Sequence, residues 1–398
     1  MDDINGAAEL LRGVIRVTPS MPAGWIDKNY GVEVRLKCEN LQRAGSFKIR
    51  GAYNRIARLT PAERSKGVVC ASAGNHAQGV ALAAQLLGIE ATVFMPVGAP
   101  IPKFKATEGY GAKVHFHGTT IDEALIAASE FSKSTGAIFI HPFDHEDIVA
   151  GQATIGLEIL EQNPDVKTVV VCLGGGGLLA GAAMAIKEQR PDIKVIGVQA
   201  AEAAAYPASL AAGSPQKLAR MATMADGIAV GRPGDIPFAM IQKYVDEIIT
   251  VSEESLARTL LLTMERSKLL VEAAGIAALA AILDNPSHFE GPVVATLSGG
   301  NIDPQLLNRV IRSGLSAAGR FMTLQVRLPD RPGALAELLT VIGTAGANIV
   351  EVSHTRINPR LDIHDVDVDI ELETRGFEHR DSILEQLHQG GFLVVDSF

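Results

Sequence analysis

Short apolar runs alternate with longer Ala-rich segments through the first 312 residues. The runs typical of β-strands are Val68–Ser72, Ala91–Met95, Lys113–Phe116, Ala137–His141, Thr168–Leu173, Lys194–Gln199 and Val293–Ser298. Helical patterns lie between most of them, at His76–Leu87, Ile121–Ser132, Gly151–Glu161, Leu178–Gln189 and Glu253–Arg266. Almost continuously apolar strands indicate a parallel sheet with helices on both faces. The pattern predicts an α/β fold, long enough for two lobes.

The pattern changes after Arg312, which indicates a second domain. Ser313–Gly319 is rich in small residues, and we expect residues 313–320 to form a flexible linker. Residues 321–398 follow the order β-α-β-β-α-β of a ferredoxin-like α+β unit. Its predicted strands are Phe321–Leu328, Ala347–Arg356, Asp362–Thr374 and Phe392–Asp396, its helices cover Leu335–Ile342 and Arg380–His388, and Asn358-Pro359 marks a turn.

Acidic and apolar residues alternate in the predicted strand Asp362–Thr374. The acidic positions that share one face are Asp365, Asp367, Asp369, Glu371 and Glu373. Such a row can suggest a metal site. We expect instead the solvent-exposed face of a half-buried strand, because alternate polar positions are typical of one.

Composition and charge exclude several classes of protein. The net charge is −9, with 36 Lys and Arg against 45 Asp and Glu, which argues against a nucleic-acid partner. No apolar run reaches the ~20 residues of a membrane span, and no apolar segment follows the acidic start, so we expect a cytoplasmic protein. None of the three cysteines is in a C-x-x-C pair, so neither a disulfide framework nor a cysteine zinc site is expected.

Four glycines in a row, Gly174–Gly177, separate a predicted strand from a helix that begins near Leu178. Glycines allow a ligand to approach the backbone, and amides at a helix N-terminus bind anions, usually phosphates. The run also matches a dinucleotide fingerprint. However, the next strand ends at Gln199 where an acidic residue would hold a ribose, and Glu202 comes a few residues late.

Three further segments carry candidate chemistry. Lys48 lies between Gly45 and Gly51. Most lysines are solvated, but a partly buried one has a depressed pKa and can form a Schiff base with a carbonyl. Ser72 and Asn75 stand at a strand-to-helix junction that can hold a carboxylate, or that is simply a helix cap.

Ser298 follows the last strand of the α/β region and can donate to, or accept from, a ring nitrogen. A lysine, a phosphate cradle, a carboxylate loop and a polar strand end together fit pyridoxal 5′-phosphate. No metal site is predicted.

At this point the sequence resembles a known family. Ser46-Phe-Lys-Ile-Arg-Gly51, Ser72-Ala-Gly-Asn-His76, Gly174–Gly177 and Ser298-Gly-Gly-Asn301 are similar to the motifs of the serine/threonine dehydratases of the tryptophan-synthase-β group, fold type II of the pyridoxal-phosphate enzymes. The resemblance implies a two-lobed catalytic region over residues 1–312, with its smaller lobe at roughly residues 50–145. Leu328–Leu335 and Gly346–Ile349 make residues 321–398 resemble an ACT regulatory domain. The whole arrangement resembles the single-ACT threonine ammonia-lyases.

The resemblance implies roles for particular residues. Lys48 is expected to hold the cofactor and then to remove the Cα proton of the substrate. The other residues expected at the cofactor are Phe47 at the ring, Asn75 at its hydroxyl, Gly174, Gly175, Gly176, Gly177 and Leu178 at the phosphate, and Ser298 at its nitrogen. The residues expected at the substrate are Ser72, Ala73, Gly74, Asn75 and His76. In isolation, His76 is more typical of a packed histidine than of a catalyst.

Two departures from relatives narrow the function. Ala73 stands where the racemases of the family carry a serine that transfers a proton, which disfavours racemisation. Gln199 and then Ala203–Ala205 stand where several relatives carry the carboxylates that bind a divalent cation; Glu202 is the one carboxylate nearby, which disfavours that site. A monovalent cation held by carbonyls stays open.

The function implied is deamination of L-threonine to 2-oxobutanoate and ammonia, with L-serine as a secondary substrate. An amino-acid effector, isoleucine or valine by resemblance, is expected at the ACT domain, which points towards isoleucine biosynthesis. ACT domains usually pair across subunits, so a homodimer or homotetramer is expected. A serine or 3-hydroxyaspartate ammonia-lyase stays open, as do, more distantly, a non-catalytic amino-acid or nucleotide-binding regulator and a dinucleotide oxidoreductase.

Overall fold

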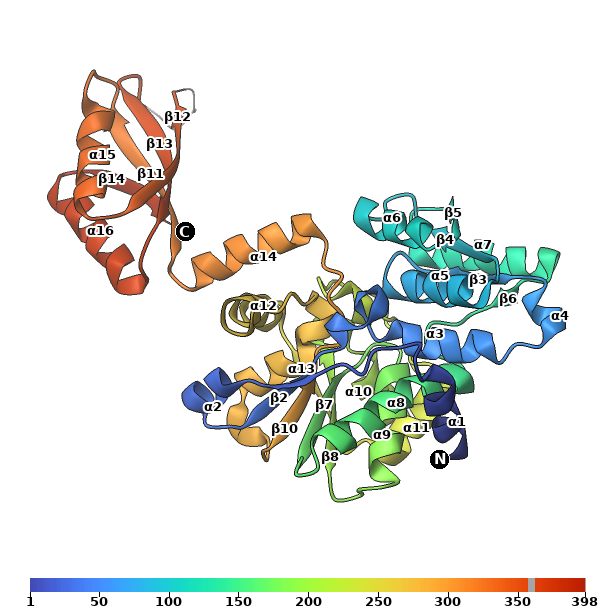
Figure 1. Ribbon diagram of the computed structural model, residues 1–398. Helices are drawn as coiled ribbons and strands as arrows, with labels where there is room; N and C mark the ends of the chain where they lie inside the picture. Colours follow the sequence, from blue (N-terminus) through green and yellow to red (C-terminus); the bar gives the residue numbers. More distant parts are fainter. Residues whose placement is uncertain (357–361, 398) are drawn as a thin grey trace. The chain divides into compact units, whose positions relative to one another are not determined.

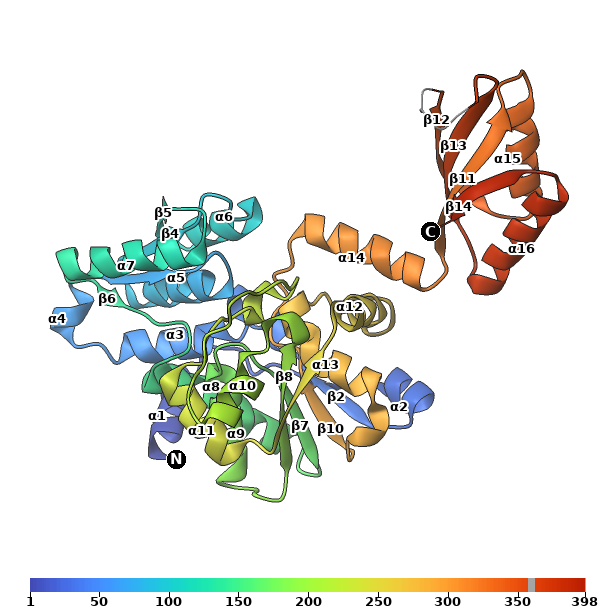
Figure 2. The same cartoon turned by 180° about the vertical axis from the view of Figure 1, so that it is seen from behind.

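The chain forms two compact units, Met1–Pro304 and Gln305–Phe398. The computed structural model describes residues 1–356 and 362–397. Figure 1 and Figure 2 show the elements of each unit from opposite sides. Within the described residues, no helix is both long and apolar enough to cross a membrane.

The first unit contains a six-stranded sheet in the order β1-β2-β10-β7-β8-β9, parallel except for β1. Its strands are β1 (Ser20–Pro22), β2 (Val34–Lys37), β7 (Thr168–Cys172), β8 (Lys194–Ala200), β9 (Glu247–Val251) and β10 (Val293–Thr296). The helices around it are α1 (Asp2–Leu11), α2 (Gly24–Tyr30), α8 (Glu146–Gln162), α9 (Gly177–Lys187), α10 (Ala205–Ala212), α11 (Asp235–Tyr244), α12 (Glu253–Ser267) and α13 (Ala273–Asp284). Every residue of β7 is buried, because α9 and α13 both pack against it.

A smaller parallel sheet, in the order β5-β4-β3-β6, lies within residues 50–145 of the same unit. Its strands are β3 (Val68–Ala71), β4 (Ala91–Met95), β5 (Lys113–Phe116) and β6 (Ile138–Phe139). Its helices are α3 (Lys48–Ala57), α4 (Pro61–Arg64), α5 (Asn75–Leu87), α6 (Ile101–Gly109) and α7 (Ile121–Thr135). Successive residues of β3 face opposite sides, so Val68 and Cys70 pack with α5 while Val69 and Ala71 pack with α7. The continuous apolar pattern of this strand follows from that double burial.

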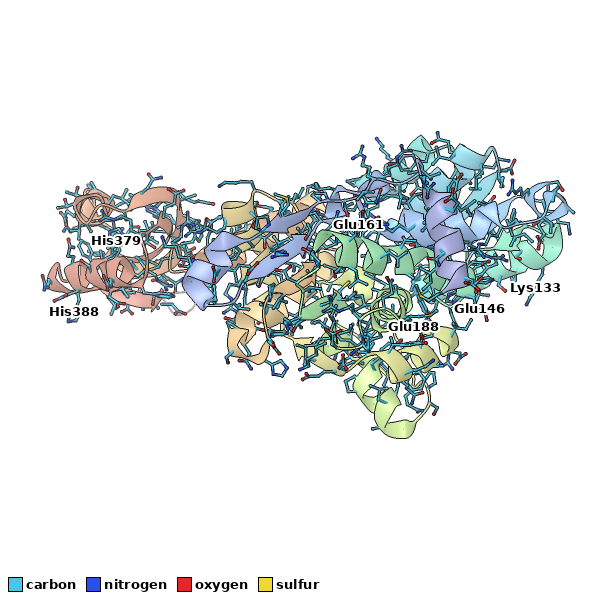
Figure 3. All side chains as sticks on the ribbon, turned by 60° about the horizontal axis from the view of Figure 1, so that its bottom comes forward. Lys133, Glu146, Glu161, Glu188, His379 and His388 are labelled. Carbon is cyan, nitrogen blue, oxygen red and sulfur yellow. The ribbon has the colours of Figure 1, made fainter. Side chains whose placement is uncertain are left out.

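Buried charges fix helix α3 beneath the site. Arg50 is fully buried, and its guanidinium donates to Glu39 at 2.8 Å and to Glu158 at 2.6 Å. Lys37 donates to Glu158 at 2.5 Å. Because two cations face two carboxylates, each buried charge has a partner. Both ends of α8, which carries Glu158, are marked in Figure 3 by Glu146 and Glu161.

The second unit is the predicted ferredoxin-like domain, with an antiparallel sheet in the order β12-β13-β11-β14. Its elements are α14 (Pro304–Ala317), β11 (Phe321–Pro329), α15 (Ala334–Thr344), β12 (Asn348–Thr355), β13 (Asp365–Glu373), α16 (Phe377–Gln389) and β14 (Leu393–Ser397). Both α15 and α16 lie on the same side of the sheet (Figures 1 and 2), and His379 and His388 mark α16 in Figure 3. The predicted α/β catalytic region with a C-terminal α+β domain is confirmed.

Two expectations for this unit are corrected. Residues 313–317, predicted as flexible linker, are the last turns of α14, because Leu306, Val310 and Leu315 give this segment an amphipathic helical pattern. The acidic row of β13 is not uniformly solvated: Asp367 is 2 % exposed, since Arg327 of the adjacent strand donates to both of its oxygens, at 2.8 and 3.1 Å. The predicted turn at Asn358-Pro359 lies outside the described residues.

Candidate active site

The four predicted loops meet at the carboxyl ends of β3, β7 and β10, beside the N-terminus of α3. The amide of Phe47 donates to the carbonyl of Ser298 at 3.1 Å, and Ser46 forms a β-bridge with Gly299. Asn75 contacts Asn301 through their side chains. Carboxyl ends of parallel strands share one edge of a sheet, which explains why segments far apart in sequence converge here.

Lys48 is the first residue of α3 and is half-buried. Its Nζ donates to the carbonyl of Pro142 at 3.0 Å and lies 5.1 Å from the centre of the Phe47 ring. Burial lowers the pKa of Lys48 to about 8, although the neighbouring Cys172 and Glu272 act to raise it. An amine with this pKa has a substantial neutral fraction near neutral pH, as a nucleophile or base requires.

The glycine loop presents unpaired amides to the site. Within the described part of the chain, none of the amides of Gly174, Gly175, Gly176, Gly177 and Leu178 has a hydrogen-bond acceptor. The N-terminus of α9 follows directly, and its dipole favours an anion. The loop therefore has the donors that a phosphate needs.

The geometry of this loop explains its glycines. Gly176 has φ of 105°, and a Cβ there would lie 2.0 Å from the Tyr206 hydroxyl. A Cβ on Gly175 would lie 2.3 Å from the Phe143 ring. Tyr206 donates to the Gly175 carbonyl at 3.2 Å, as does the amide of Gly234 at 3.1 Å. Because a trans peptide points its carbonyl and amide in opposite directions, these two bonds turn the Gly176 amide the other way.

The loop Ser72–Gly74 ends at α5. The hydroxyl of Ser72 accepts from the amide of Gly74 at 3.1 Å, while Ser72, Ala73, Gly74 and Asn75 are all half-buried. His76 is different. Its ring is buried and hydrogen-bonded to the carbonyl of Ile140 at 2.9 Å, and burial with the charge of Lys48 lowers its pKa to about 3. The His76 side chain therefore has the packed, neutral role, and only its backbone is left for a substrate carboxylate.

Ser298 is 3 % exposed, and its hydroxyl accepts a hydrogen bond from the Cys172 thiol at 3.2 Å. Burial raises the pKa of Cys172 to about 11, so the thiol keeps its proton. No acceptor for the Ser298 hydrogen is present among the described residues. This hydroxyl therefore has a hydrogen to donate to whatever fills the site, which favours the donor role that the sequence leaves open.

Glu272 is a site residue that sequence reasoning missed. It precedes α13, is 3 % exposed, and accepts from Asn75 Nδ2 at 2.5 Å. Burial, with the charge of Asp226, raises its pKa to about 7. The available signal was one carboxylate in the otherwise apolar run Leu269–Ala274.

Two alternatives from the sequence analysis, a dinucleotide site and a metal site, can be compared with the structure. Gln199, where a dinucleotide site needs an acid, is buried and accepts from the amide of Tyr206 at 2.9 Å. Lys103 of α6, which the sequence analysis did not identify, donates to Asp226 at 2.5 Å. This ion pair joins a helix of the smaller sheet to the 3-10 turn Asp226–Ile228. In the described ranges, no three His, Cys, Asp or Glu side chains converge as a metal site requires.

Comparisons with known proteins agree with this geometry. Residues 11–299 match the family model "Pyridoxal-phosphate dependent enzyme", and residues 322–389 match the ACT domain. The chain is 45 % identical to an L-threonine ammonia-lyase of Thermotoga maritima, over 99 % of this chain and 98 % of that protein. It is 42 % identical to the catabolic L-threonine dehydratase TdcB of Escherichia coli K12, over 78 % of this chain and 95 % of that protein.

Solved structures give the same result. The processed form of threonine deaminase isoform 2 from Solanum lycopersicum has a TM-score of 0.74 and 36 % identity, covering 78 % of this chain and 86 % of its own. Maize serine racemase has a TM-score of 0.74 and 34 % identity, and the match covers 79 % of this chain and 98 % of the racemase chain. The unpaired amides, the lysine and the serine donor are the groups that a phosphorylated pyridine aldehyde needs. The chain therefore belongs to the family of pyridoxal-phosphate dependent enzymes, and its second unit is an ACT domain.

Proposed function

We propose that this protein deaminates L-threonine to 2-oxobutanoate and ammonia by α,β-elimination. The observation that carries the proposal is the half-buried amine of Lys48, placed in one site with the unpaired amides of Gly174–Leu178 and the Ser298 donor. The named relatives that span nearly the whole chain, both L-threonine ammonia-lyases, support the substrate.

The bound cofactor, pyridoxal 5′-phosphate, acidifies the Cα proton of an amino acid by withdrawing electrons from that carbon. Phe47, Lys48, Asn75, the glycine loop and Ser298 are the residues that would hold it. Nζ of Lys48 is the base that accepts the Cα proton, because its lowered pKa leaves a fraction of the amine neutral. The β-hydroxyl would then leave as water, for which the proton accepted by Nζ is available, and hydrolysis of the released enamine gives 2-oxobutanoate and ammonia.

Binding of the substrate carboxylate falls to the Ser72–Asn75 loop. The N-terminus of α5 begins at Asn75, and its first amides favour an anion. Racemisation is a second candidate because of the similarity to maize serine racemase. It needs a second proton donor opposite Lys48, and the methyl group of Ala73 cannot supply one.

The assay is 2-oxo acid release from L-threonine, L-serine and L-threo-3-hydroxyaspartate at equal concentrations. We expect L-threonine to give the highest kcat/KM, with L-serine second. Lys48→Ala should abolish turnover and the visible band of the bound cofactor, while Lys105→Ala, an exposed lysine on α6, should leave both unchanged. Higher kcat/KM for either other substrate would overturn the assignment to threonine.

We also propose that the ACT domain binds an amino-acid effector, of the isoleucine or valine class, and that the enzyme is a homodimer or homotetramer. The dehydratase TdcB matches over 95 % of its own length but over only 78 % of this chain, which supports catalysis without a complete second unit. A chain ending at Pro304, the boundary between the units, should deaminate threonine without an effector response. An unchanged response would contradict the regulatory proposal, and a monomeric mass in solution would contradict the assembly.

A further inference from the structure

The amide of Asn75 is held between two side chains that come from the other sheet. Its Oδ1 accepts from Asn301 Nδ2 at 2.8 Å, and its Nδ2 donates to Glu272 Oε1 at 2.5 Å. Asn75 begins α5, beside the smaller sheet, whereas Asn301 follows β10 and Glu272 precedes α13, both beside the larger one. Neither Asn301 nor Glu272 has a role in the chemistry described above.

Backbone atoms fix the direction of this chain of hydrogen bonds. Asn301 Nδ2 also donates to the carbonyl of Ala44 at 2.8 Å, and a carbonyl can only accept. Ala44 presents that carbonyl from a left-handed conformation, with φ of 56°. A Cβ on the adjacent Gly45 would lie 2.4 Å from Asn301 Oδ1, so glycine is needed for Asn301 to fit.

The orientation of each amide then follows from the one before it. With its nitrogen on Ala44, Asn301 offers a donor to Asn75, so the oxygen of Asn75 faces Asn301. The nitrogen of Asn75 must therefore face Glu272, whose carboxyl oxygen accepts. Reversing Asn75 would set oxygen against oxygen at one end and nitrogen against nitrogen at the other. Both hydrogen bonds would be lost.

One hydrogen of Asn75 Nδ2 is not used in this arrangement. A primary amide nitrogen carries two, and Glu272 takes one. The other has no acceptor among the described residues. Asn75 lies in the site with Lys48 and is half-buried, so a ligand oxygen is the group that this second N–H can satisfy.

We propose that Asn301 and Glu272 are positioning residues. They hold the Asn75 amide so that its free N–H points at the 3-hydroxyl oxygen on the pyridine ring of the bound cofactor. The proposal rests on the cofactor of the proposed function but not on its substrate. The proposal also explains Ala44 and Gly45. The Ala44 carbonyl is the fixed acceptor at one end of this series of hydrogen bonds, and Gly45 leaves room for Asn301.

The charged groups that face Glu272 are Lys48 from α3, Lys103 from α6, and Asp226 from the 3-10 turn Asp226–Ile228. None of them contacts the amide of Asn75 in the hydrogen bonds of the described residues. Removing the Glu272 carboxyl therefore tests the orientation of Asn75, while Glu272→Gln keeps an oxygen that accepts from it.

The test measures binding of pyridoxine 5′-phosphate, which has the ring oxygen but no aldehyde, to cofactor-free enzyme. We expect Glu272→Ala to weaken its binding about fivefold to tenfold, the effect of one hydrogen bond, and Glu272→Gln to stay within about twofold of the wild type. Asn301→Ala should act like Glu272→Ala, which provides a second variant. Glu254→Ala, an exposed position on α12, is the control.

Two outcomes would overturn the proposal. An analogue without the 3-oxygen should bind all variants equally, so a persisting effect of Glu272→Ala would show general damage to the pocket. In the Asn75→Ala background, Glu272→Ala should have no further effect, and additive losses would mean that Glu272 does not act through Asn75. Failure of the wild type to bind either analogue would instead refute the proposed function.

Discussion

Replacing the Glu272 carboxyl by an amide should make the cofactor-free protein more stable at neutral pH. Burial raises the pKa of Glu272 from 4.5 to about 7. A carboxyl with a raised pKa in the folded state contributes stability that is complete below about pH 4.5 and is lost as the pH rises through about 7. Glu272→Gln is neutral at every pH and keeps an acceptor for Asn75, so it avoids that loss.

The size of the effect follows from the shift. A shift of about 2.5 pKa units corresponds to about 3 kcal/mol, at 1.36 kcal/mol per unit. The wild type loses most of this stabilisation between about pH 5 and pH 7.5, as Glu272 ionises. Glu272 also raises the pKa of Lys48, so the difference between the two proteins reports Glu272 together with its coupling to that amine.

The assay is urea unfolding of the two proteins across this range, followed by fluorescence of Trp25, the one tryptophan of the sequence. Trp25 lies on α2 of the first unit and donates to Ser267 at 2.9 Å, so it reports the unit that contains Glu272. We expect the stability advantage of Glu272→Gln to grow by about 2 kcal/mol from pH 5 to pH 7.5. A pH-independent difference would refute the reasoning, and Glu254→Gln, at an exposed position, is the matched control.

Further predictions concern other parts of the first unit. Arg50→Leu leaves the buried Glu39 carboxylate without its cation, while Glu158 keeps only Lys37. It should lower the free energy of unfolding by about 3–5 kcal/mol in the same urea assay, whereas a loss below about 1 kcal/mol would contradict this account. Gly175→Ala should abolish measurable cofactor binding in an absorbance titration, because its methyl would lie 2.3 Å from an aromatic carbon; Gly24→Ala, with open space around it, should have no effect. Cys172→Ala removes the thiol that donates to Ser298, so the visible absorbance band of the bound cofactor should shift. Cofactor binding should weaken by no more than about threefold. An unchanged spectrum would contradict this prediction.

Local patterns predicted the strands that position the site, because both faces of those strands are buried. The predicted strand at Ala91–Met95 has the observed bounds, and the predicted Thr168–Leu173 ends one residue late. The glycine loop was also recognisable, since four glycines between a buried strand and a helix favour an anion site. These features depend on neighbouring residues alone, which is why the sequence reveals them.

Sequence patterns did not identify elements in which apolar residues recur with no clear period. The helix α13, Ala273–Asp284, is almost wholly buried and apolar all round, so no polar face marks it as a helix. The edge strand β9, Glu247–Val251, is mostly half-buried and too short to give a clear alternation. Residues 313–317 have linker composition, yet the helix that precedes them continues through them. In each case the neighbouring structure, and not local preference, decides the conformation.

The contacts between motifs are what the sequence could not supply, and they decide the chemistry. Ser298 was expected either to donate or to accept; the Cys172 thiol occupies one lone pair of its oxygen, and the hydroxyl hydrogen has no acceptor among the described residues, which favours donation. A ring nitrogen that accepts a hydrogen bond from a neutral hydroxyl need not carry a proton, so it draws fewer electrons from the substrate than a protonated nitrogen would. Weaker withdrawal favours rapid loss of the β-hydroxyl over prolonged storage of charge on the ring, as transamination requires. We therefore expect elimination at this site to depend on Ser298, whose hydroxyl contacts a cysteine 126 positions away in the sequence.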